Sequence, residues 1–276
     1  MLIRLSQSLS QSRFSMKSKT LCFLVAVACS INAYSATYST DFNAFTAGLD
    51  VAGQDGWTIN DTASVSNVIG WMLNGTTTNA AGLGFAAAGY MPTLPTIDLS
   101  HSLGLPILNA QNGGIGASFD MAIFGSSDPT HPARDTFGFS LTSTGTNVFS
   151  VVFTPSIVVP DAWAISYTVG ADPSVNAHLG VVQDTAQSFQ LSFTPGVGTT
   201  NYSLQIGDGN WTGTTSLASS TVIDKFSMVW QPTDGPANAG SNGLAIDNLV
   251  LVPETSASLM LSLGGIGLAC RRRRSA

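Results

Sequence analysis

The chain has 276 residues, with ten Lys and Arg against sixteen Asp and Glu, and a formal net charge of −6. Residues 36–252 keep only two of the cations, Arg134 and Lys225, against fifteen Asp, so this body has a formal charge of −13. Such a body argues against nucleic-acid binding, which needs clustered Lys and Arg. It also contains no Glu and no Cys, which removes glutamate-dependent catalysis, disulfides and thiolate metal sites.

Residues 1–35 have the pattern of a secretory signal peptide. A basic stretch precedes the apolar run 21–28, and small residues at the first and last positions of 33–35 predict cleavage after residue 35. This predicts passage through the Sec export machinery. Two alternatives remain open: translation starting at Met16, and a lipoprotein acylated on Cys29.

Residues 36–251 are predicted to form one all-β domain. Apolar side chains alternate with polar ones in many short segments, for example Phe189, Leu191 and Phe193 between Ser and Gln, and helix formers are scarce. Turns are expected at 143–146 and 207–209. The strands we expect are 64–73, 115–123, 137–142, 148–153, 161–169, 188–193, 202–206, 222–230 and 244–251. Many strands without helices predict an antiparallel two-sheet β-sandwich, because the rival parallel β-helix requires a short repeat that is absent.

Short motifs at both ends of this body resemble concanavalin-like or laminin-G-like jelly rolls. They are Thr40-Asp41-Phe42, Gly53-Gln54-Asp55-Gly56-Trp57 and the closing run from Ala245 to Leu251. The resemblance implies that the terminal strands pair and that the domain binds carbohydrate or protein.

The resemblance also implies a calcium ion where the terminal strands meet, with Asp41 and Asp247 as ligands. Calcium prefers hard oxygen ligands such as Asp carboxylates and loop carbonyls. A second option is Asp208-Gly209-Asn210. The alternative for the first pair is surface charge at strand ends, and for Asp208 it is an ordinary Asp-Gly turn.

Tryptophan side chains offer a further means of binding sugars, because their apolar faces stack on sugar rings. Trp211 follows the polar turn at 208–210 and is our candidate ligand-binding residue. Trp230 alternates with Met228 and Phe226 and is assigned to the core.

The C-terminal 25 residues have three parts. Val252-Pro253-Glu254 is followed by the uncharged, mostly apolar segment 255–270 and by four arginines, Arg271, Arg272, Arg273 and Arg274. A helix of that length covers ~24 Å, less than the ~30 Å hydrocarbon core of a bilayer, so it forms only a short transmembrane helix. The arginines should stay cytoplasmic.

This arrangement resembles the PEP-CTERM sorting signal of Gram-negative bacteria. Pro253 and Glu254 match the first two motif positions, whereas Thr255 replaces the usual second Pro. The resemblance implies an exosortase-type processing protease as partner. It also implies transient residence in the inner membrane, removal of the helix, and delivery to the cell surface or extracellular matrix.

Taken together, the sequence predicts an exported, non-enzymatic surface or matrix protein that binds glycans such as polysaccharide. No HExxH or GxSxG motif is present. Two alternatives remain: a secreted carbohydrate-active enzyme that uses Asp residues, and a purely structural matrix protein.

Overall fold

The computed structural model describes residues 38–61, 65–73, 76–85, 93–108, 115–125, 134–159, 161–195, 198–218, 221–233 and 242–253. The predicted signal peptide and everything from Glu254 onward lie outside these ranges. Among the described residues, no helical segment has the length and apolarity needed to span a bilayer.

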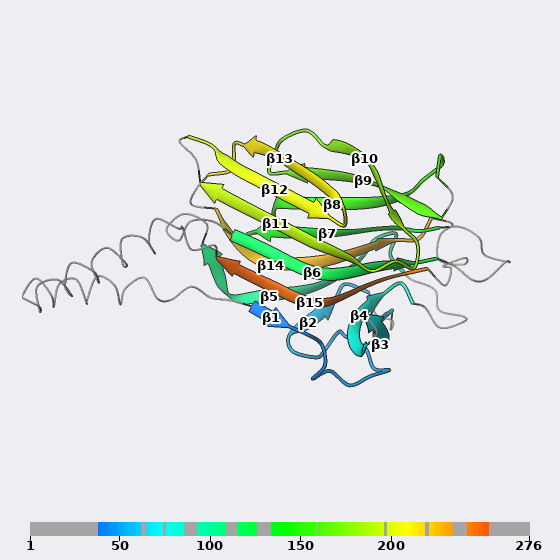
Figure 1. Ribbon diagram of the computed structural model, residues 1–276. Coiled ribbons are helices and arrows are strands. Elements are labelled where there is room, and N and C mark those ends of the chain that lie inside the picture. The colour runs from blue at the N-terminus through cyan, green and yellow to red at the C-terminus, as the bar shows by residue number, and fades with distance from the viewer. Residues whose placement is uncertain are drawn as a thin grey trace, which may run out of the picture. The chain divides into compact units, whose positions relative to one another are not determined.

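The described residues form two antiparallel sheets that pack face to face (Figure 1). The eight-stranded sheet has the order β13–β12–β11–β6–β15–β4–β3, with β1 paired to β15 beside this path. Its strands are β1 (Tyr38–Thr40), β3 (Ser66–Leu73), β4 (Thr76–Leu83), β6 (Ile115–Phe124), β11 (Gln187–Pro195), β12 (Thr200–Ile206), β13 (Gly209–Thr215) and β15 (Gly243–Pro253).

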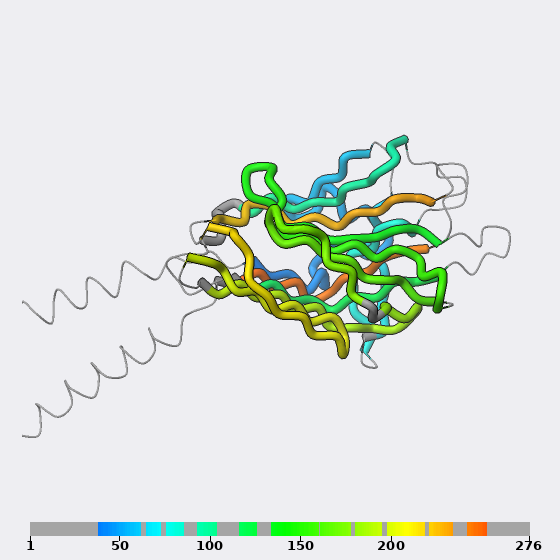
Figure 2. Tube along the Cα trace, turned by 90° about the horizontal axis from the view of Figure 1, so that it is seen from above, coloured from blue at the N-terminus to red at the C-terminus, as the bar shows by residue number. Residues whose placement is uncertain are grey.

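The second sheet has seven strands in the order β10–β9–β8–β7–β14–β5–β2. They are β2 (Trp57–Ile59), β5 (Ile97–Leu108), β7 (Thr136–Ser143), β8 (Thr146–Pro155), β9 (Ala162–Val169), β10 (Val175–Val182) and β14 (Val222–Gln231). Figure 2 shows the two layers edge-on. The predicted all-β, two-sheet antiparallel jelly roll is therefore confirmed.

The core lies between the inner faces of the sheets, where the predicted alternation places apolar side chains. Phe189, Leu191 and Phe193 are each exposed by 2% or less. Phe119 of β6 stacks on Phe189 with a centroid distance of 4.3 Å and meets Phe139 of the other sheet at 4.7 Å. These contacts join the two layers. Burying each aromatic side chain stabilises the fold by ~1.5–3 kcal/mol.

The predicted turns are found where the sequence places them. Gly207 and Asp208 connect β12 to β13, and Thr144 and Gly145, both with positive φ, connect β7 to β8. Positive φ at both central residues is typical of the hairpin turns that match strand twist.

Asp135 is a buried acceptor that joins two tryptophans. Its Oδ2 accepts a hydrogen bond from Trp230 Nε1 at 2.9 Å, and its Oδ1 accepts one from Thr233 N at 2.9 Å. Its backbone oxygen accepts a third from Trp163 Nε1 at 2.8 Å. Both tryptophans are fully buried, so the assignment of Trp230 to the core is confirmed.

The first and last strands of the body pair with each other, as the jelly-roll resemblance implies. Tyr38 lies opposite Leu251, Ser39 opposite Val250 and Thr40 opposite Leu249. This pairing brings the loop after β1 against the centre of the eight-stranded sheet.

Candidate functional site

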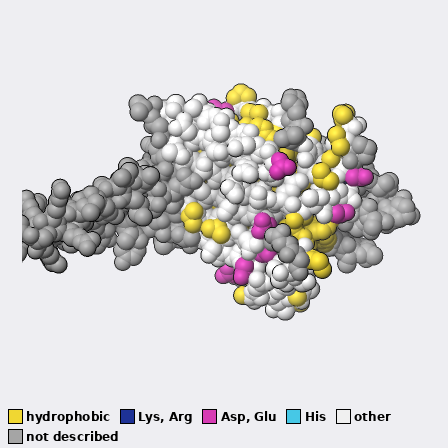
Figure 3. Space-filling view, viewed as in Figure 1, with side chains coloured by type: hydrophobic (Ala, Val, Ile, Leu, Met, Phe, Trp, Pro, Cys, Tyr) yellow, Lys and Arg dark blue, Asp and Glu magenta, His cyan; other side chains and the backbone are white. Residues whose placement is uncertain are grey.

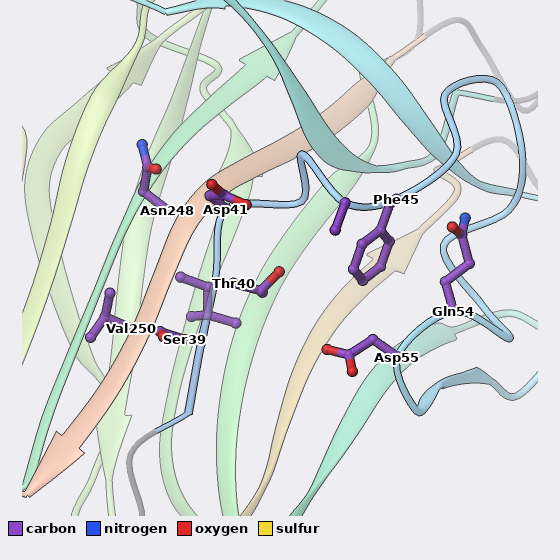
Figure 4. Close-up of a pocket in the computed structure, with 10 residues that line it drawn as sticks. Ser39, Thr40, Asp41, Phe45, Gln54, Asp55, Asn248 and Val250 are labelled. Carbon is purple, nitrogen blue, oxygen red and sulfur yellow. The ribbon is translucent and has the colours of Figure 1, made fainter.

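A groove of about 810 Å³ opens where β1, the loop 41–55 and β15 meet. In Figure 4, Asp41 and Asn248 lie on one side of this terminal-strand groove, Gln54 and Asp55 lie on the other, and Thr40 lies between them. The groove thus combines carboxylate, amide and hydroxyl groups. Its apolar lining comes from Ala44, Phe45, Leu249 and Val250.

The loop that forms one wall is held in place by its own side chains. Phe42 has a positive φ of 54° and is fully buried, with ring contacts to Phe45 at 5.1 Å and to Trp57 at 5.8 Å. Gln54 Oε1 accepts a hydrogen bond from Thr46 N at 2.8 Å, and its Nε2 donates to Asp50 O at 2.6 Å. Because these contacts fix both ends of the loop, the groove is largely formed before a ligand arrives.

A chain of polar aromatic side chains supports Asp55. Trp57 Nε1 donates to Tyr38 Oη at 3.2 Å, and Tyr38 Oη donates to Asp55 Oδ2 at 3.4 Å. Tyr38 stacks on His101 with a centroid distance of 4.2 Å. His101 Nε2 lies 2.8 Å from Asp55 O. Burial raises the pKa of the Tyr38 phenol well above its ordinary value, so Tyr38 remains a donor at physiological pH.

A β-bulge positions the acidic groups at the other side of the groove. The pairing of β15 with β6 shifts register between Asp247 and Val250, and Asn248 takes a φ of 54°, which Asn tolerates better than most residues. Asn248 Nδ2 then donates to Asp120 Oδ2 at 2.8 Å. The bulge therefore turns Asn248 toward the groove and ties it to the neighbouring strand.

Asp247 itself is only 1% exposed. Its Oδ2 accepts from Thr78 Oγ1 at 2.8 Å and its Oδ1 from Asn248 N at 2.7 Å. Burial raises the pKa of Asp247, the two hydrogen bonds oppose this, and the charges of Asp41 and Asp120 add to the increase. The charges of Asp41 and Asp120 thus disfavour the ionised form of Asp247.

The two predicted calcium ligands, Asp41 and Asp247, come from opposite ends of the body, and the charge of Asp41 contributes to the raised pKa of Asp247. Within the described ranges, no group of three or more His, Cys, Asp or Glu side chains is arranged to hold a metal ion. Asp208, the second option, is exposed in the β12–β13 turn. Calcium binding stays a prediction.

Trp211 is half-buried and packs against the core, with its ring 6.2 Å from that of Tyr167. The other four tryptophans, Trp57, Trp71, Trp163 and Trp230, are buried. These four therefore present no open aromatic platform for a sugar, and Trp211 exposes only part of its ring. A ligand-binding role for Trp211 stays a prediction.

The predicted sorting residues fall at or beyond the end of the described chain. Pro253 ends β15, whereas Glu254, Arg271, Arg272, Arg273 and Arg274 lie outside the described ranges.

Sequence reasoning missed the group formed by Tyr38, Asp55 and His101, and also Asp120. The members of the first group are 17 and 46 residues apart, and no local spacing connects them. Asp120 was missed for the same reason, since it comes opposite Asp247 only when β6 and β15 pair.

No family model matches the sequence, and no curated protein matches it. Solved structures with a similar fold include the carbohydrate recognition domain of Emp47p, with a TM-score of 0.50 and 10% identity. That match covers 79% of this chain and 96% of the domain.

Two further matches have slightly lower TM-scores. Winged bean acidic lectin complexed with methyl-α-D-galactose has a TM-score of 0.49 and 11% identity, covering 79% of this chain and 98% of the lectin. A sialidase also has a TM-score of 0.49, with 10% identity, but the match covers only 18% of its chain against 79% of this one. At 10% identity, the match to the Emp47p domain shows a similar fold and nothing about function.

Proposed function

We propose that this protein is an exported, non-enzymatic surface or matrix protein that binds glycans. The observation that carries the proposal is the terminal-strand groove, a preformed polar cleft on a sandwich whose fold is similar to that of a carbohydrate recognition domain. Sugar hydroxyls both donate and accept hydrogen bonds, so they suit a cleft that mixes carboxylate, amide and hydroxyl groups.

In the groove, Asp41 and Asp55 would accept hydrogen bonds from sugar hydroxyls, and Thr40 would exchange one. Hydrogen bonds to a carboxylate are the stronger kind, contributing ~1.5–3 kcal/mol each. Phe45 and Val250 would contact the apolar CH groups of the ring. Tyr38 would keep Asp55 oriented through the bond that it already donates.

Calcium is part of this proposal. A divalent cation bound through Asp41 and Asp247 would offset the unfavourable effect of the Asp41 and Asp120 charges on the Asp247 carboxylate. Thermal melts of the full chain in calcium, in magnesium and in chelator test this directly. An unchanged melting temperature in calcium would remove the ion from the proposal.

Glycan binding is tested by applying the full chain, purified in detergent micelles, to a glycan array. Asp55→Asn keeps the shape of the side chain and removes its charge, and we expect it to weaken binding about tenfold, which corresponds to ~1.4 kcal/mol. Asp184→Asn, exposed in the turn between β10 and β11, is the matched control. A wild-type protein that binds no glycan would refute the proposal and favour the purely structural role.

The enzymatic alternative has one observation in its favour, since Asp41 and Asp55 line the same groove. Glycosidases use a pair of carboxylates on either side of the scissile bond. Release of reducing sugar that is lost in Asp55→Asn would establish a carbohydrate-active enzyme and overturn the non-enzymatic assignment.

Export and sorting form the remaining part of the proposal, resting on residues 1–35 and on the segment from Pro253 to Arg274. We expect Sec-dependent export and removal of segment 255–270 by an exosortase-type protease. Mass spectrometry of the protein from the cell surface tests this, and an intact C-terminal peptide ending at Ala276 would refute the sorting step.

A further inference from the structure

The outer face of the eight-stranded sheet carries uncharged polar side chains in register across four strands. Ser118 of β6 lies opposite Gln190 of β11, which lies opposite Gln205 of β12, which lies opposite Asn210 of β13. These side chains point outward because their neighbours along each strand, such as Leu191 and Leu204, are buried between the sheets.

A second row lies beside the first, two residues away from it on each strand. Gly116 pairs with Ser192, Ser192 with Ser203, and Ser203 with Thr212. We name the two rows together the amide–hydroxyl face: Ser118, Gln190, Gln205, Asn210, Ser192, Ser203 and Thr212.

The middle of this face is hollowed into a groove of about 410 Å³. Its lining includes Gly116, Ser118 and Ser192, whose small side chains leave space, and the longer Gln190 and Gln205. The groove runs across the strands and is lined by residues of both rows. It is separate from the terminal-strand groove, with which it shares no lining residue.

Most polar groups on this face are free to bind a ligand. Gln190, Ser192 and Ser203 make no side-chain hydrogen bond to any other residue that the structure describes. Gln205 Nε2 donates to Gly207 O at 3.2 Å, which fixes the amide and leaves its Oε1 as an acceptor. Amides and hydroxyls offer donors and acceptors side by side, which matches adjacent hydroxyls of a sugar.

The negative charge around this face favours neutral polymers over anionic ones. Figure 3, which views this side of the molecule, shows scattered acidic groups and no Lys or Arg among the side chains coloured. The two cations of the body lie elsewhere, Lys225 on β14 and Arg134 just before β7, both in the other sheet. A body of −13 repels polyanions, so an uncharged chain is favoured.

We propose that the amide–hydroxyl face binds an extended, neutral polysaccharide that runs across the strands. Adjacent strands are ~4.8 Å apart, so a row over four strands offers contacts along ~14 Å, which suits several consecutive sugar units. Individual neutral hydrogen bonds contribute only ~0.5–1.5 kcal/mol, so binding depends on many of them acting along one chain. The inference rests on the proposed glycan-binding function and adds a second site and a ligand class to it.

Affinity electrophoresis of the full chain through gels that contain a neutral polysaccharide tests this inference. The probes are a β-1,4-glucan, an α-1,4-glucan and a galactomannan, with a polyuronate for comparison. We expect retardation by at least one neutral polymer and none by the polyuronate. The double variant Gln190→Ala/Gln205→Ala should weaken retardation at least tenfold, whereas Thr154→Ala, exposed on the other sheet, should not.

Each other outcome counts against the inference. Loss of retardation in Asp55→Asn with an unaffected double variant would assign the polymer to the terminal-strand groove, keeping the proposed function and overturning this one. A wild-type chain that no polysaccharide retards would overturn both. A third outcome is that the wild-type chain binds no polysaccharide but self-associates, and that the double variant does not self-associate. The face would then be a contact between copies of the chain. Near-ultraviolet circular dichroism confirms that the variants are folded.

Discussion

Replacing Asp135 with Ala tests the reasoning about buried polar groups most directly. The carboxylate is 1% exposed and accepts from Trp230 Nε1 inside the core and from Thr233 N near the surface. Asp135→Ala leaves both donors without this acceptor, while the bond from Trp163 to the backbone oxygen persists.

The magnitude follows from the burial of each donor. An unsatisfied donor inside the core costs ~1–3 kcal/mol, and a part-buried donor that water can reach loses only the net contribution of its hydrogen bond, ~1 kcal/mol. We therefore expect Asp135→Ala to lower the free energy of unfolding by about 2–4 kcal/mol. That is a large share of the ~5–15 kcal/mol that stabilises a typical domain.

Urea denaturation followed by tryptophan fluorescence measures this change, because Trp163 and Trp230 both lie at the affected site. Asp208→Asn, in an exposed turn, serves as the control and should change stability by less than ~0.5 kcal/mol.

A double-mutant cycle sharpens the test. Trp230→Phe removes the core donor, so in that background Asp135→Ala should cost ~1–3 kcal/mol less than in the wild type. Equal costs in the two backgrounds, or a cost of Asp135→Ala no larger than that of the control, would refute the reasoning.

Three further predictions concern single residues in the two sheets. The raised pKa of Asp247 means that its ionisation opposes folding, so wild-type stability falls as pH rises from the ordinary value of 3.8 through the raised value. In chelator, Asp247→Asn should therefore melt at a higher temperature than wild type at pH 7, and the difference should vanish below pH 3.8; a lower melting temperature at pH 7 would contradict this. Gly138→Ala would place a Cβ 2.5 Å from Val151 O, so calorimetry should show a loss of ~1–3 kcal/mol, against little change for Gly70→Ala, where the nearest atom is 3.8 Å away. Asn248→Val should cost more than Asn248→Gly, because a β-branched residue resists the positive φ at this bulge, and equal urea midpoints would argue against that strain.

The sequence predicts the strands whose alternation is strong and misses those whose side chains are small. The pattern of Phe189, Leu191 and Phe193 identifies β11 and its inner face. By contrast, β4 consists of Thr, Asn, Ala, Gly and Leu, and it pairs with β3 and β15 without any alternation that a local reading detects. The strands β10 and β13 were missed for a similar reason, since Gly and short polar residues interrupt them. The strand β5 was missed although Ile97, Leu99 and Leu103 alternate with polar residues.

The candidate site likewise has a part that sequence motifs predict and a part that they do not. Motifs at both ends of the body predict that the terminal strands pair, and β1 does pair with β15; that Asp41 and Asp247 share a calcium ion there stays a prediction. The contacts among Tyr38, Asp55 and His101 depend on how a turn-rich loop folds over β5, and local sequence patterns do not encode that geometry. The amide–hydroxyl face likewise requires the order of strands in the sheet, which alternation alone does not give.

The position of β15 has a consequence for how the chain folds. This last strand of the body lies between β4 and β6 and also pairs with β1, so it joins three strands that come much earlier in the sequence. Until residues 243–253 are available, β4 and β6 have no partner between them, and the eight-stranded sheet stays in two pieces. Contacts between residues so far apart in the sequence are slow to form. The body therefore reaches its native state only after its whole length is available.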